Sequence, residues 1–215
     1  MKSYSYLLLM GVALLMSCTP DGLKQVKSEN LEVYSVKDVD GEYEKGPLSF
    51  SESRVYDERG NELKHLIRQK DNSLFREAFI YDKGDLIRSN YYNSDSLLIS
   101  YYTYELEAGL IKTKKSFDAQ NDELLRIETY EYNSKGLRNK KTISEASGTL
   151  SRTMVFAHDQ YGNEIQVTVR DGTGKIILNE MHKILSYDVD KRWLEKWSFF
   201  DDKPISYRRR TLDYY

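Results

Sequence analysis

A short turn pattern recurs along most of the chain. It has an aromatic residue, an Asp or Asn, one or two further residues, a Gly and then an aliphatic residue, as in Tyr56–Leu63, and the copy from Tyr104 to Leu110 lacks the Asp or Asn. An Asp or Asn at the first turn position caps the turn backbone with its side chain, and the Gly takes a positive φ. The pattern therefore predicts tight turns, 24 to 27 residues apart, at five anchoring glycines, which are Gly60, Gly84, Gly109, Gly136 and Gly162.

Weaker turn signals, such as Asp71–Ser73 and Asp171–Gly174, lie between these anchors. The structural unit is therefore one strand and one turn, and the segments between turns alternate apolar and polar residues, as in Ile165–Arg170. No stretch after the first 17 residues has a sustained helical period with caps. We predict an all-β, antiparallel meander of about a dozen strands built from repeated β-hairpins, which forms a curled sheet or a partly open barrel. Residues 31–53 add the first strands.

The repeated units resemble YD repeats of the Rhs type over residues 54–215. The resemblance implies a β-hairpin architecture. It is not extended to the toxin-encapsulating function of Rhs proteins, because a closed Rhs shell needs many more repeats.

The first residues resemble a bacterial export signal. Lys2 supplies a positive charge, and the apolar run Leu7–Met16 is too short to span a bilayer. The sequence Leu15-Met16-Ser17-Cys18 resembles a lipobox, which implies that Cys18 is acylated and becomes the mature N-terminus. Cys18 is the only cysteine, so a disulfide scaffold and a Cys-rich metal site are excluded.

Three regions follow from this interpretation. Residues 1–17 form a lipoprotein signal peptide, residues 18–30 a lipidated N-terminus and flexible tether, and residues 31–215 a β-repeat domain. The membrane is then a partner through the lipid anchor. We expect a lipid-anchored protein of the cell envelope, and the residues after Cys18 favour the outer membrane while leaving its periplasmic or surface face open.

Charge and hydropathy exclude other classes. The chain has 32 basic and 34 acidic residues, a net charge of -2, which argues against nucleic acid as a partner. A mean hydropathy of -0.66 excludes a multi-span membrane protein.

Tyrosine is unusually abundant, with 18 copies. Tyrosines in strands form cross-strand ladders that stiffen a sheet, and a row of exposed ones forms a platform for glycan or peptide. The structural use is favoured. The candidate binding aromatics are Tyr91, Tyr92, Tyr101, Tyr102, Tyr104, Tyr130 and Tyr132.

No catalytic or metal-binding constellation is evident. His65, His158 and His182 have no second ligand at metal spacing, and no Gly-x-Ser-x-Gly elbow marks a nucleophile, although a dispersed Ser-His-Asp triad stays open. The acidic group Asp38–Glu44 is interpreted as a solvated turn rather than a calcium loop. We therefore predict no catalytic residue, no metal and no cofactor.

Two further motifs have surface interpretations. Asp95-Ser96-Leu97 matches a short O-glycosylation acceptor motif of Bacteroidetes, which makes Ser96 a candidate modification site at a turn. The basic run Arg208–Arg210 is interpreted as a strand edge that resists aggregation, with its charges divided between the two faces.

The leading function is a non-enzymatic envelope lipoprotein, a scaffold or partner-binding protein whose partner is an envelope protein or a glycan. The first alternative is a carbohydrate-binding module that uses exposed tyrosines. The second is an enzyme whose site is assembled from scattered residues. A row of tyrosines on one exposed face would favour the first alternative, and a pocket with converging His or carboxylate groups would favour the second.

Overall fold

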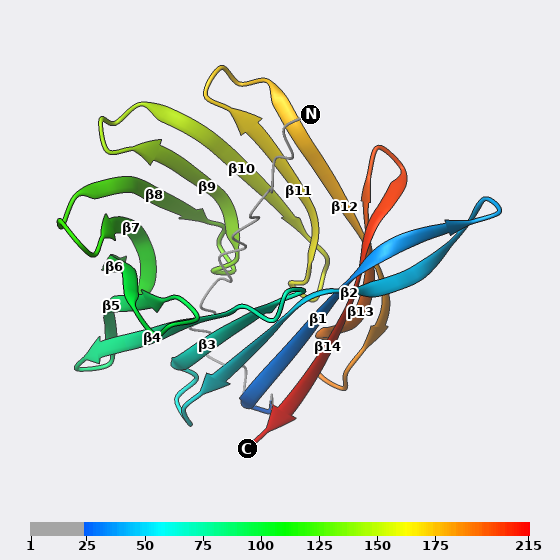
Figure 1. The fold of residues 1–215 in the computed structure, drawn as a ribbon, viewed down its shortest axis with the longest axis horizontal. Coiled ribbons are helices and arrows are strands. Elements are labelled where there is room, and N and C mark those ends of the chain that lie inside the picture. Colours follow the sequence, from blue (N-terminus) through cyan, green and yellow to red (C-terminus); the bar gives the residue numbers. More distant parts are fainter. Residues whose placement is uncertain (1–23) are drawn as a thin grey trace.

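The computed structural model describes residues 24–215, which form fourteen strands (Figure 1). In chain order they are β1 (Val26–Val39), β2 (Glu42–Tyr56), β3 (Glu62–Gln69), β4 (Leu74–Asp82), β5 (Asp85–Tyr92), β6 (Leu98–Glu107), β7 (Leu110–Asp118), β8 (Leu124–Tyr132), β9 (Arg138–Glu145), β10 (Leu150–His158), β11 (Glu164–Asp171), β12 (Ile176–Tyr187), β13 (Trp193–Phe200) and β14 (Lys203–Tyr214). Within this part of the chain, no helix is long and apolar enough to cross a membrane.

The sheet closes on itself. Each strand pairs antiparallel with its neighbour in sequence, and β1 pairs with β14 to complete a barrel. The predicted all-β antiparallel meander is confirmed, with closure where the sequence allowed a partly open barrel. Strand β1 begins at Val26, inside the segment expected to be tether, because its residues pair with β14 on one side and β2 on the other.

Closure changes the interpretation of the basic run Arg208–Arg210. Its charges do divide between the two faces, because Arg208 is buried inside while Arg209 is exposed. The run is not an edge, however. Arg208, Arg209 and Arg210 pair with Val33, Glu32 and Leu31 of β1.

The turns have the predicted chemistry. Oδ1 of Asp57 accepts hydrogen bonds from the backbone N–H groups of Arg59 (2.9 Å) and Asn61 (2.8 Å), and Gly60 has a φ of +83°. The turn at Asp159 repeats this arrangement, with Gly162 at +88°. Such turns continue the right-handed twist of the flanking strands. Their spacing sets the length of the strands between them.

The face that points into the barrel is mainly polar. Its apolar cluster consists of Phe156, Val167 and Val169 on β10 and β11, with Met154 and Leu178 packed against them. Around the rest of the ring, the buried side chains among residues 24–215 are mostly charged or hydroxylated.

The outer face carries both polar and apolar side chains, and its exposed apolar residues include Val55, Ile80, Val155 and Met181. Residues directly opposite one another on paired strands share a face, and one outer row runs across β6 to β11 without an apolar residue. Its members are Glu105, Thr113, Thr129, Thr142, Thr153 and Arg170. In place of a large hydrophobic core, the barrel has a continuous backbone ladder with mainly polar contacts on its inner side.

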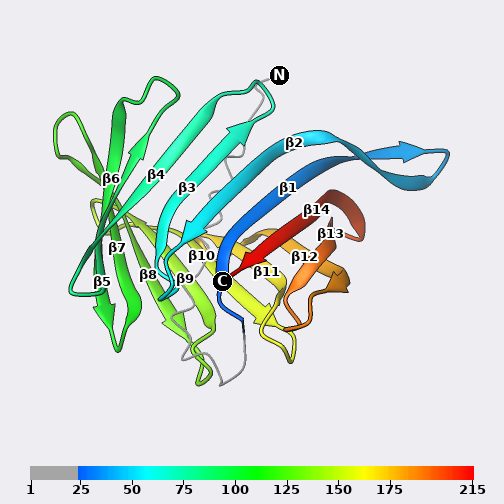
Figure 2. The ribbon, with the colours of Figure 1, turned by 90° about the horizontal axis from the view of Figure 1, so that it is seen from below.

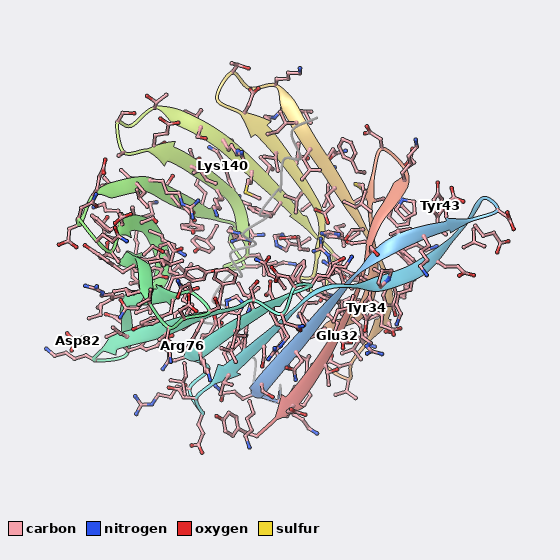
Figure 3. The ribbon with its side chains drawn as sticks, in the orientation of Figure 1. Glu32, Tyr34, Tyr43, Arg76, Asp82 and Lys140 are labelled. Carbon is pink, nitrogen blue, oxygen red and sulfur yellow. The ribbon has the colours of Figure 1, made fainter. Side chains whose placement is uncertain are left out.

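The β1–β2 hairpin is longer than the others and projects past the barrel (Figure 2). Its outer part, from Val36 to Lys45, pairs only within the hairpin, and Tyr43 lies near the tip (Figure 3). The base of this arm lies beside β14.

Asn163 connects two neighbouring hairpin turns. Its Nδ2 donates to Oδ2 of Asp159 (3.0 Å) and to the carbonyl of Lys191 (2.9 Å), and its Oδ1 accepts from the N–H of Trp193 (3.1 Å). We expect Asn163→Ala to lower the free energy of unfolding by about 2 kcal/mol, because it removes three part-buried hydrogen bonds, two of them to the backbone of Lys191 and Trp193. Urea unfolding measures this. Gln160→Ala, at an exposed position of the same turn, is the control and should change the value by less than about 0.5 kcal/mol.

Candidate functional site

Two places on the barrel concentrate functional groups: a belt of buried charges inside, and a groove on the outer face. The belt begins on β2, β3 and β4. Nε2 of His65 lies 3.2 Å from Oε2 of Glu52, and its Nδ1 lies 3.9 Å from Oε2 of Glu77. Ser89 on β5 donates to Oε1 of Glu77 at 2.5 Å. The guanidinium of Arg54 also contacts Glu52, at 2.6 Å.

The belt continues on β7, β8 and β9. Nζ of Lys141 lies 2.8 Å from Oε2 of Glu128, and the hydroxyl of Tyr130 donates to the same oxygen at 2.6 Å. Lys114 lies on the inner face opposite Glu128, with its Nζ 3.7 Å from the centre of the Tyr102 ring. Each buried charge in this part of the barrel therefore faces an opposite charge or a ring.

Burial and pairing act in opposite directions on these groups. Burial alone would raise the pKa of Glu128, but Lys141 and Lys114 outweigh it and hold the pKa at about 2. The pKa of Glu62 rises to about 7, because its burial exceeds the attraction of Arg54 and His65. Burial likewise lowers the pKa of Lys196, to about 7. The strong pairing of Glu128 marks it as a structural anchor.

The inner face of β11 to β13 brings a Ser, a His and a Glu together, an arrangement left open by the sequence. Nδ1 of His182 lies 3.0 Å from Oγ of Ser198, and its Nε2 lies 3.4 Å from Oε1 of Glu164. Ser198 is 0% exposed, so no substrate reaches its hydroxyl. The contact between His182 and Glu164 also falls short of a hydrogen bond. This cluster therefore fits a buried polar network rather than a nucleophilic triad.

His158 lies on the same inner face, opposite Glu164, and is half-buried. Burial lowers its pKa. Within residues 24–215, no group of three or more His, Cys, Asp or Glu side chains has the arrangement of a metal site. At the acidic hairpin tip, Oδ1 of Asp38 accepts from the N–H of Gly41 at 3.0 Å, as in an ordinary capped turn.

The second place is a groove of about 340 Å³ on the outer face, where β14, β1 and β2 lie side by side. The register arranges its residues in two cross-strand rows. Thr211, Asn30 and Ser53 form the first row. Arg209, Glu32 and Ser51 form the second. Short polar side chains therefore form the floor, with one ion pair across it.

An aromatic row borders this groove. Trp197, Tyr207 and Tyr34 lie opposite one another on β13, β14 and β1. The rings of Trp197 and Tyr207 meet edge to face, with centroids 5.2 Å apart, and those of Tyr207 and Tyr34 are 6.0 Å apart. Nζ of Lys45, from the arm, lies 4.2 Å from the centre of the Tyr34 ring. Figure 3 shows Glu32 and Tyr34 together at the base of the arm.

The Glu32 carboxylate joins the floor to this aromatic row. Its Oε2 accepts from the hydroxyl of Tyr34 (2.8 Å) and from Nε of Arg209 (2.8 Å). Burial alone would raise the pKa of Glu32, but these hydrogen bonds and the charge of Arg209 lower it. Glu32 is therefore an anion with a fixed orientation at the mouth of the groove.

The candidate residues from the sequence are widely separated. Cys18 lies outside the described residues. Ser96 is exposed at the β5–β6 turn, where its N–H bonds the carbonyl of Asn93. Of the seven candidate tyrosines, two face outward, Tyr92 and Tyr101, each covered by an arginine, with Arg76 and Arg88 respectively 4.3 and 3.9 Å from the ring centres. The other five belong to the inner face, namely Tyr91, Tyr102, Tyr104, Tyr130 and Tyr132.

Sequence reasoning did not find the groove. Its residues come from both ends of the chain, and they meet only because β1 pairs with β14. The available signals were the outward alternation of Tyr207 and Arg209 in β14, and of Tyr34 and Glu32 in β1.

Comparison with solved structures supports a shared barrel fold. A porin-like protein from Bacteroides uniformis has a TM-score of 0.53 at 10% sequence identity, with 87% of this chain and 98% of that chain covered. A porin-like protein from Bacteroides vulgatus has a TM-score of 0.48 at 12% identity, with 90% and 99% covered. The TcdB2-TccC3 structure scores 0.34 at 12% identity, with 85% of this chain and 11% of that chain covered.

Only the first of these scores supports a conclusion, and at 10% identity that conclusion is limited to the fold. No protein-family model and no curated protein matches the sequence. The repeated β-hairpin architecture is confirmed, while the specific resemblance to YD repeats stays a prediction.

Two ion pairs on β8 and β9 allow a matched test of the inner belt. Glu128 and Lys141 are 6% and 5% exposed, whereas Glu131 and Lys140 are 57% and 41% exposed, and both pairs are 2.8 Å apart. We expect Glu128→Gln to lower the free energy of unfolding by about 3–5 kcal/mol at neutral pH, because it leaves a buried ammonium without its partner. Glu131→Gln should cost under about 1 kcal/mol.

The pH dependence of unfolding provides an independent check on the same pair. The folded pKa of Glu128 lies below its ordinary value of 4.5, so its stabilisation is complete above pH 4.5 and is lost as the pH falls toward 2. The free energy of unfolding, measured with urea at several pH values between 2 and 4.5, should fall less steeply with falling pH in Glu128→Gln than in the unmodified protein. An unchanged slope would contradict the role assigned to the Glu128–Lys141 pair.

Proposed function

We propose that the protein is a non-enzymatic, lipid-anchored component of the cell envelope, whose barrel stands in water and presents its outer face to a partner. The observation that carries this proposal is the polar outer row from Glu105 to Arg170, which crosses six adjacent strands and so interrupts the exposed apolar residues of that face, such as Val155 and Met181. A lipid-facing barrel wall carries an apolar band instead. In this proposal the lipid on Cys18, rather than the wall, supplies the attachment to the membrane.

The energetic argument concerns the charged residues of the outer face. On the outer face, Lys115 of β7 forms an ion pair with Glu105 of the neighbouring strand β6, at 2.5 Å, and Lys140 of β9 forms one with Glu131 of β8. A Lys or Arg at the bilayer midplane of a barrel costs about 2–4 kcal/mol each. Several such residues on adjacent strands therefore favour a wall in contact with water.

The inner face supports a scaffold rather than an enzyme. Its charges are engaged with one another, as in the contacts of Glu128 with Lys141 and of Glu52 with His65 and Arg54. The His182 and Ser198 side chains that meet there are buried. The outer face is then the surface available to a partner, and a carbohydrate is the second candidate, favoured by the groove beside Tyr34 and Tyr207.

The anchor is tested by Cys18→Ala in a bacterial host fed radiolabelled palmitate. The unmodified protein should incorporate label and sediment with membranes. The variant should incorporate none and stay in the soluble fraction. Label that persists in Cys18→Ala would refute acylation at this residue.

The water-facing barrel is tested with residues 19–215 in detergent-free buffer. We expect a β-type circular dichroism spectrum and one cooperative urea transition, because the outer face needs no lipid. The same segment with added detergent is the control and should give the same spectrum. A chain that folds only when detergent is present would refute the proposal, whatever the result for Cys18.

A further inference from the structure

We infer that the outer groove over β14, β1 and β2 binds an uncharged oligosaccharide. This inference deepens the proposed function. It rests on that proposal only in assuming that the outer face of the barrel is in contact with water. It starts from the two rows of the groove floor, which contain three hydroxyl side chains and one carboxamide, Thr211, Ser51, Ser53 and Asn30.

The hydrogen-bonding groups of these four side chains are available to a ligand. None of them makes a side-chain hydrogen bond within residues 24–215, although each lies on a regular strand between paired neighbours. Together they offer donors and acceptors in a small area. A ligand with many hydroxyl groups satisfies such a surface, because each of its groups donates and accepts as well.

The Glu32–Arg209 pair adds a fixed acceptor to this floor. Within the described residues, every contact of the Glu32 carboxylate is made by Oε2. Its Oε1 therefore keeps its capacity to accept. A carboxylate acceptor makes stronger hydrogen bonds than a neutral one, and the three donors on Oε2 hold it in position.

The aromatic border supplies the apolar part of the site. Sugar rings present faces of C–H groups, which pack on aromatic side chains while the hydroxyls at their edges bond polar neighbours. Tyr34 and Tyr207 lie in this border beside Trp197. Nζ of Lys45 is 4.2 Å from the centre of the Tyr34 ring and 5.6 Å from that of Tyr207, so Tyr207 offers the less covered ring to a sugar. Tyr and Trp suit such a role since they combine a large apolar surface with a polar end.

Charge balance selects a neutral ligand over an acidic one. Glu32 is neutralised by Arg209, and Glu195 and Lys45 flank the pair with one further charge of each sign. No net charge is left in the groove to attract a polyanion. The volume of about 340 Å³ is at the lower end of the range for small-ligand sites, roughly 300–1,000 Å³, which suits a short segment of a glycan.

The test is isothermal titration of the mature lipidated protein, residues 18–215, in detergent micelles. The probes are four neutral tetrasaccharides, of the cello-, malto-, manno- and chito- series, with tetragalacturonate as the acidic comparison. We expect at least one neutral probe to bind and tetragalacturonate to bind at least ten-fold more weakly. Absence of binding by every neutral probe overturns the inference, and so does a preference for the acid.

Variants place the site. Ser51→Leu fills the floor from a half-exposed position without touching the interior and should weaken binding at least ten-fold. Tyr207→Ala should do the same, whereas Tyr207→Phe keeps the ring and should retain binding within about three-fold. Tyr101→Ala, on the outer face of β6, is the matched control and should bind normally.

Each outcome is decisive once circular dichroism shows the variants folded. Binding that survives both Ser51→Leu and Tyr207→Ala would place the glycan elsewhere and overturn the inference. Loss of binding in Tyr101→Ala as well would show a non-specific effect and also overturn it. Palmitate labelling of Cys18 is independent of these titrations, so failure here leaves the anchored scaffold standing.

Discussion

The pairing of β1 with β14 is the constraint on which the rest of this structure depends. Backbone hydrogen bonds leave no open edge in the ring itself, outside the projecting β1–β2 arm, and in an antiparallel sheet closure is the only complete solution to that problem. Most small domains rely on an apolar core. Here the compact apolar cluster is limited to Phe156, Val167 and Val169 with two neighbours, so the ladder and its flanking contacts carry the fold.

The composition follows from this architecture. A wall whose inner face is mainly polar needs side chains that pack well without an apolar core. Tyrosine and the long cations meet this need as pairs, for a lysine or arginine lies over an aromatic ring on either side of the wall. Lys114 over Tyr102 is an inner example, and Arg88 over Tyr101 is an outer one. The high content of tyrosine and the high content of charged residues thus have the same structural cause.

Much of the fold was predictable because its signals are local. The capped turns at Asp57 and Asp159 are encoded within five residues each, and their repetition sets the number and direction of the strands. Closure was not predictable in the same way. The residues of β1 and β14 carry no motif that identifies one another, and the start of β1 is as polar as a tether.

The sites divide along the same line. The exposed position of Ser96 follows from its turn, which the sequence shows. Which tyrosines face inward depends on whether the odd-numbered or the even-numbered residues of each strand point into the barrel. Register shifts at the hairpin ends change this alternation from one strand to the next. Predicting the groove would have required knowing both which residues face outward and that β1 pairs with β14, because Glu32 and Arg209 are 177 residues apart in sequence.

The position of the closing pair has a consequence for how the chain acquires its structure. Ser28 meets Asp213, so the last contacts to form join the two ends of the described sequence. Contacts of such long separation form slowly, because their loop entropy is lost before they stabilise anything. A chain made from its N-terminus can assemble hairpins one by one, but β1 waits unpaired on one side until the final strand is available. During synthesis the chain is therefore an open ribbon, and the barrel closes only after β14 has emerged.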